Sequence, residues 1–83
     1  MEKEQILKEL NSIFREVLNA SELVINENQG AGDIDGWDSI THMLLITNIE
    51  QHFGVKFKLR EVNSIGSIGD IISLLNSKLN NAV

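Results

Sequence analysis

The stretch DIDGWDSITHMLLI, residues 33–46, holds the residues of this chain whose types and spacing are best suited to chemistry. Ser39 offers a hydroxyl, Asp38 stands directly before it, and His42 follows three residues later. A serine in this position can be a helix-start residue, a nucleophile or an attachment point for a phosphate-linked group. The element that follows and the rest of the chain decide between these interpretations.

The residues around Ser39 predict the start of a helix. Asp38 is a natural N-cap, because its carboxylate can accept hydrogen bonds from free backbone N–H groups at the positive end of the helix dipole. Ser39 then lies in the first turn, where a serine needs no function. A phosphoester on Ser39 would place anionic oxygens beside the same N–H groups, which suits covalent attachment of a phosphodiester. Both interpretations stay open on these residues alone.

A catalytic serine is the weaker interpretation. No GxSxG elbow surrounds Ser39, and the second histidine, His52, lies about two and a half helical turns beyond His42. A small bundle also leaves little room for a cleft. We therefore expect no hydrolase activity and interpret His42 as an exposed residue on the helix surface.

The acidic loop before Ser39 does not fit known metal or nucleotide loops. With Gly36 at the sixth position of an EF-hand, Ala31 falls at the first and His42 at the twelfth, where acidic ligands are required. The segment GAGDID lacks the last glycine of GxGxxG and follows no strand. Asp33 and Asp35 are interpreted as solvated loop residues, with a weak surface contact to a cation left open, and we expect no resident metal.

Charge and composition restrict the partners and the compartment. The 83 residues carry a net charge of −5, with no lysine or arginine between Arg15 and Lys56. Seven acidic residues fall in that interval, which disfavours nucleic acid and favours basic protein partners. The chain has no cysteine, no signal-peptide pattern at its start and no apolar run near the roughly 20 residues of a membrane span. We expect a soluble cytoplasmic protein, monomeric and not inserted in a membrane.

Hydrophobic periodicity predicts three long helices, over residues 3–18, 39–53 and 67–80. Gly54 is placed to end the second, and Ser67 with Asp70 resembles a capping box at the start of the third. The apolar stripe expected to face the core from the second helix consists of Ile40, Met43, Ile46, Ile49 and Phe53.

The segment VKFKLR, residues 55–60, alternates like a half-buried strand, but no partner strand exists. We predict an extended connection there, followed by a single helical turn over 61–65 that carries Val62 and Ile65 inward. The fold class is then all-α: one domain over residues 1–83, a small four-helix bundle with three long helices and one short. Its long first loop, residues 19–37, delivers Ser39 to the second helix.

The motif GWDSI, followed by the apolar stripe through Phe53, resembles the Asp-Ser-Leu motif of acyl carrier proteins and their peptidyl and aryl carrier relatives. The order of elements extends the resemblance over nearly the whole chain. The resemblance implies that Ser39 carries 4′-phosphopantetheine, attached from coenzyme A by a phosphopantetheinyl transferase with Mg²⁺. The thiol of that arm would hold an acyl thioester, and the carrier itself would catalyse nothing.

The same resemblance assigns docking roles on the second helix. Asp38 and Ile40 would help to dock the transferase, with Leu44 and Glu50 as further partner contacts, although an isolated exposed leucine is also ordinary. Gln51 and His52, like Leu44, stand where carriers of primary fatty-acid synthesis often have acids. We therefore favour a specialised fatty-acid, polyketide or related pathway, with a dedicated acyl-loading ligase or synthase as partner. A peptidyl carrier of a nonribosomal-type pathway and a non-covalent acidic adaptor remain alternatives.

Three apolar residues are expected in the vicinity of the arm or its acyl chain. Met43 and Ile65 would flank an opening into the bundle where an acyl chain could shelter, and ordinary core packing is the alternative for both. Trp37, directly before the motif, would lie near the arm or anchor the loop.

Overall fold

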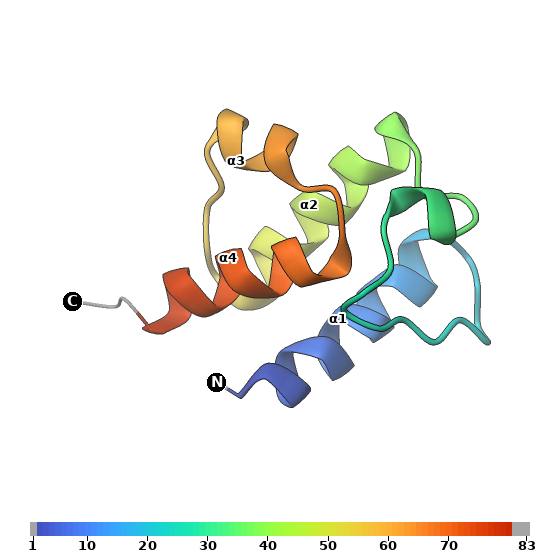
Figure 1. Ribbon diagram of the computed structural model, residues 1–83, viewed down its shortest axis with the longest axis horizontal. Coiled ribbons are helices and arrows are strands. Elements are labelled where there is room, and N and C mark those ends of the chain that lie inside the picture. The colour runs from blue at the N-terminus through green and yellow to red at the C-terminus, as the bar shows by residue number, and fades with distance from the viewer. Residues whose placement is uncertain (1, 81–83) are drawn as a thin grey trace.

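The structure, a computed structural model that describes residues 2–80, is built of helices joined by extended segments (Figure 1). The helices are α1 (Lys3–Val17), the 3-10 turn η1 (Ala31–Asp33), α2 (Ser39–Phe53), α3 (Leu59–Ser64) and α4 (Ile68–Asn80). No strand occurs between residues 2 and 80, where an isolated bridge joins Gly30 to Ser67. The predicted all-α bundle with three long helices and one short is confirmed. Within the same residues, no helix combines the length and apolarity that a membrane span requires.

The ends of the helices follow the predicted signals closely. Gly54 ends α2 in the left-handed conformation, with φ 68°, and α1 ends one residue before its predicted boundary. At the start of α4 the Asp70 N–H donates to Ser67 Oγ over 3.2 Å, so Ser67 precedes the helix and caps it. The carboxylate of Asp70 reaches back to the Gly66 N–H.

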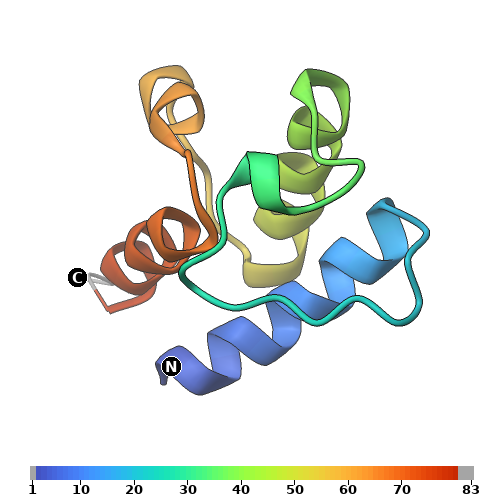
Figure 2. The same cartoon turned by 45° about the vertical axis from the view of Figure 1, so that its right-hand side comes forward.

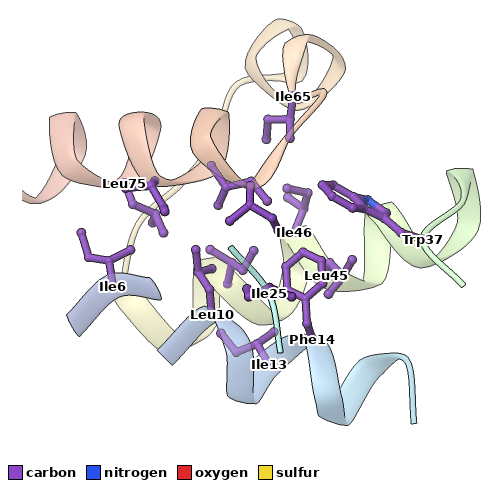
Figure 3. Packing of buried hydrophobic residues seen from close by; sticks show 14 of the residues in the cluster. Ile6, Leu10, Ile13, Phe14, Ile25, Trp37, Leu45, Ile46, Ile65 and Leu75 are labelled. Atoms are coloured by element: carbon purple, nitrogen blue, oxygen red, sulfur yellow. The ribbon is translucent and has the colours of Figure 1, made fainter. Parts of the chain in front are cut away.

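The core lies where α1, α2 and α4 meet. Each of these helices supplies residues at helical spacing, and their side chains meet in the space between the helices (Figure 3). The most completely buried members are Ile6, Leu10, Phe14, Leu45, Ile49, Ile68, Ile71 and Leu75.

The apolar face of α2 differs from the predicted stripe. Ile40 is 75% exposed and Met43 49% exposed, whereas Leu45, which the stripe omitted, is 1% exposed. Each step of three residues falls about 60° short of a full helical turn, so a stripe at constant spacing of three drifts about 180° between Ile40 and Ile49. Residues at both ends of that stripe cannot all face the core.

The connection after α2 is extended over residues 55–58, but α3 begins two residues earlier than the predicted turn. Glu61 Oε1 accepts a hydrogen bond from the Lys58 N–H over 2.7 Å and so closes the first turn of α3. Leu59, which belongs to the apolar side of the alternating segment 55–60, starts this helix instead and is 72% exposed.

The long first loop is held against the helices rather than hanging free. It passes across α1 and reaches the start of α4 (Figure 2). There the Ile68 N–H donates to the Gln29 carbonyl and the Gly69 N–H to the Glu27 carbonyl, each over 2.9 Å. Loop carbonyls thus satisfy N–H groups that the first turn of α4 cannot satisfy itself. The loop is fixed a few residues before it presents Trp37 and Ser39.

Candidate functional site

Ser39 is the first residue of α2, and its side chain is exposed. Asp38 caps the helix as predicted: its Oδ1 accepts from the Ile40 N–H over 3.0 Å and from the Thr41 N–H over 2.9 Å. Thr41 Oγ1 in turn accepts from the Asp38 N–H over 2.8 Å. The bond from the Thr41 N–H is the main cause that holds the pKa of Asp38 below the ordinary aspartate value. A hydrogen-bonded cap therefore fixes the backbone that carries Ser39.

Trp37 anchors the loop just before this cap. Its side chain is 6% exposed, and its indole meets the Phe14 ring edge-on at the margin of the core, with 5.2 Å between ring centroids (Figure 3). The Nε1–H donates to His42 Nδ1 over 2.9 Å, and the two rings stack with centroids 6.0 Å apart. Trp37 thus ties the loop both to α1 and to α2.

His42 lies differently from its predicted place on the helix surface. The ring is partly buried, and Nε2 lies 3.0 Å from the Val62 carbonyl oxygen of α3. Because the Trp37 indole can only donate, Nδ1 must accept, so Nε2 carries the proton and donates to Val62. The sequence pattern could not reveal this contact, since its α3 partner lies twenty residues along the chain.

A pocket of about 350 Å³ opens beside Ser39, between the start of α2 and α3. Trp37, Met43 and Ile65, the three residues predicted near the arm, all line it, and Val62 and Ile65 are buried as predicted. Most of the exposed surface in the pocket is apolar. The full lining consists of Ala31, Trp37, Asp38, Ser39, His42, Met43, Val62, Asn63 and Ile65.

The predicted docking residues do not form one cluster. Ile40 and Leu44 are exposed, at 75% and 51%, near Ser39 on α2. Glu50 lies eleven residues beyond Ser39, about 16 Å along the helix axis. It is partly buried, and its Oε2 accepts from the Phe57 N–H over 2.8 Å, so this carboxylate holds the connection after α2.

Neither histidine of α2 is free to act as a base for Ser39. Both ring nitrogens of His42 are engaged, by Trp37 and by Val62. His52, farther along α2, pairs with Glu9 of α1. Across residues 2–80, no three histidine or acidic side chains gather in a way that could hold a metal ion. What remains is an exposed hydroxyl at a capped helix start, next to an apolar pocket.

Comparison with known proteins points the same way. Residues 8–75 match the family described as phosphopantetheine attachment site. An acyl carrier protein of Thermotoga maritima is 32% identical over 77 residues, covering 93% of this chain and 95% of its own. An acyl carrier protein of Renibacterium salmoninarum is 35% identical over 75 residues, covering 89% and 91%. The solution NMR structure of a holo acyl carrier protein from Geobacter metallireducens superposes with a TM-score of 0.84 at 38% identity, over 92% of this chain and 87% of that one.

Proposed function

The chain belongs to the acyl carrier protein family, and we propose that Ser39 is the residue to which its 4′-phosphopantetheine is attached. The cofactor of this family is covalently bound, and the chain is a carrier rather than a catalyst. The observation that carries the assignment to Ser39 is its exposed hydroxyl at the start of α2, behind the Asp38 cap. The positive end of the helix dipole suits the phosphodiester that attachment would create.

The surroundings of Ser39 fit such a group. The hydroxyl is open to a transferase, and the pocket beside it offers apolar surface to the arm or its cargo. When bound, the arm supplies the thiol on which cargo travels as a thioester, since this chain has no cysteine of its own. Phosphopantetheinyl transferase and acyl-handling enzymes are the partners that the family implies.

The docking surface supports a specialised acyl pathway rather than a housekeeping one. Ile40 and Leu44 present apolar side chains beside Ser39. An acidic surface at this place would instead favour enzymes with basic docking patches. Of the two acidic residues in α2 and its cap, Glu50 is engaged with Phe57 and Asp38 caps the helix. Asp38 and Ile40 are proposed to meet the transferase, and Leu44 and Glu50 the acyl-loading ligase or synthase.

We place the carrier in the cytoplasm as a monomer, with residues 1–83 forming one carrier domain. We propose fatty-acid, polyketide or related biosynthesis as its pathway. Aminoacyl cargo from a nonribosomal-type pathway and a non-covalent adaptor role are outcomes that the experiment below distinguishes.

The test is intact mass spectrometry before and after incubation with coenzyme A, Mg²⁺ and a permissive phosphopantetheinyl transferase. Starting from unmodified, folded protein, the wild type should gain the mass of one phosphopantetheine. Ser39→Ala should gain nothing, and Ser73→Ala, which removes an exposed serine on α4, should behave as the wild type. If Ser73→Ala lost the modification, or if Ser39→Ala kept it, the assignment of the attachment site to Ser39 would be wrong. No gain with several transferases would favour the adaptor, and loading by aminoacyl but not acyl ligases would favour the peptidyl carrier.

A further inference from the structure

The pocket beside Ser39 is shallow along α2. The only α2 residues that line it are Ser39, His42 and Met43, which span about 6 Å of helix axis. Leu45 and Ile46 follow directly and are buried in the core, yet neither lines the pocket. The pocket therefore does not extend to the core side chains that follow Met43 on α2.

His42 lines this pocket and joins three segments of the chain there. Trp37 before α2 donates to its Nδ1, and its Nε2 donates to the Val62 carbonyl of α3. We name this hydrogen-bonded chain of Trp37, His42 and Val62 the cross-brace. All three members line the pocket, so the brace lies against any chain that enters it. Trp37 is itself fixed against Phe14, which anchors the brace to α1.

A longer acyl chain would have to break the cross-brace to go deeper between α2 and α3. Separating His42 from Val62 leaves the His42 N–H without a partner beside apolar side chains, while the Val62 carbonyl keeps only its 3.4 Å bond from the Ile65 N–H. This loss opposes the gain from burying more methylene groups. A short chain can occupy the existing hollow without disturbing either hydrogen bond. The brace therefore discriminates by chain length.

On the basis of the proposed function, we infer that His42 is a specificity-determining residue that limits the sheltered cargo to short acyl chains. Removing its imidazole takes away the link to Val62 and a ring that lines the pocket. In His42→Ala both hydrogen bonds of the cross-brace are already absent, so a deeper chain breaks neither of them when it enters. Cargo longer than the hollow stays exposed to solvent and to partner enzymes in the wild type.

The test loads the wild type with phosphopantetheine and then with butyryl, hexanoyl, octanoyl or decanoyl groups. Intact mass confirms loading, and the rate at which hydroxylamine cleaves the thioester measures shelter. In the wild type, protection should stop increasing at the short end of the series. In His42→Ala, octanoyl should be cleaved on the order of tenfold more slowly than in the wild type, the factor expected from burying roughly two more methylene groups.

The matched control is His52→Ala, which removes the other imidazole of α2, paired with Glu9 away from the pocket. It should keep the wild-type length profile. A role of His42 that is only structural would change protection equally for all chain lengths, or not at all, and either result overturns the inference. A shift of the length profile in His52→Ala would overturn it as well.

A second measurement uses the wild type alone, so it tests the inference even if His42→Ala fails to fold. Nuclear Overhauser contacts from the octanoyl chain should reach Met43 and Ile65 but not Ile46 or Ile49. Contacts to Ile46 or Ile49 would show that the brace does not limit depth. Failure to gain phosphopantetheine in the first step would refute the proposed function and this inference together. Normal loading with an unchanged length profile would refute this inference alone.

Discussion

Replacing Gly69 by alanine should destabilise this protein, although alanine is the better helix former. In an open helix the change would add about 1 kcal/mol of stability. Gly69, in the first turn of α4, donates its N–H to the Glu27 carbonyl over 2.9 Å. A Cβ atom at Gly69 would lie 2.9 Å from that same carbonyl oxygen, closer than a carbon and an oxygen can comfortably approach.

The loss of stability in Gly69→Ala depends on which atoms must move to make room for the Cβ. The Glu27 oxygen cannot retreat without lengthening the bond that it accepts, and the neighbouring bond from Ile68 to the Gln29 carbonyl restrains the same stretch of loop. Losing one such bond costs about 1 kcal/mol, and leaving its partner poorly solvated costs about 1–3 kcal/mol more. Against the gain in helix propensity of about 1 kcal/mol, we expect a net loss of about 1–3 kcal/mol. In a domain of this size each kcal/mol lowers Tm by roughly 4–8 °C.

The assay is urea unfolding followed by circular dichroism, with Gly32→Ala as the control. A Cβ at Gly32 meets nothing within 4 Å, so that variant should stay within about 0.5 kcal/mol of the wild type. The reasoning is refuted if Gly69→Ala matches or exceeds the stability of the wild type with an unchanged m-value. A loss of equal size in Gly32→Ala would show that the glycine itself, not the packing of the loop, is responsible.

Three further changes test the cap, the core and the end of α2. Because hydrogen bonds from Thr41 and Ile40 lower the pKa of Asp38, its contribution to stability is present above the unfolded pKa and is lost as pH falls through the folded one. Asp38→Asn should therefore flatten the acid side of a stability–pH profile measured by urea unfolding; an unchanged profile would contradict this. Phe14→Ala removes a fully buried ring and should cost about 3–5 kcal/mol in the same assay, with a smaller loss implying collapse around the site. Gly54→Ala forces a side chain onto φ 68° and should lower stability by about 1 kcal/mol, which thermal unfolding would show.

The helices could be predicted from the sequence because their signals are local. Periodic apolar residues, the Asp38 cap and Gly54 each act within a few residues of the boundary that they set, and α2 begins and ends where they indicate. The core-facing side of α2 could not be read as securely. A spacing of three and a spacing of four drift in opposite directions around a helix, so the packing of α1 and α4 selects Leu45 and leaves Ile40 outside.

The motif around Ser39 could be predicted from the sequence, but the contacts of the side chains around it could not. Asp38 and Ser39 are adjacent in the chain, and their geometry follows from helix capping alone. The contact of His42 depends on Val62, whose carbonyl is positioned by a separate helix, and no periodicity in either segment records it. The turn that starts α3 at Leu59 likewise depends on the reach of the Glu61 side chain to the Lys58 backbone.

The first turns of α2 carry two proposed functions on different faces of the helix: partner docking and closure of the pocket. Among the described residues, five large apolar side chains are markedly exposed, and three of them, Ile40, Met43 and Leu44, lie within five positions of α2 beside Ser39. Such clustering is typical of an interaction surface, and the fold gains little from apolar side chains that it leaves in water. His42, between Thr41 and Met43, instead turns inward to the cross-brace. A partner that docks on Ile40 and Leu44 would therefore contact the same turns of α2 that carry His42 on their other side. Docking of a partner and release of cargo can thus be coupled through this short segment.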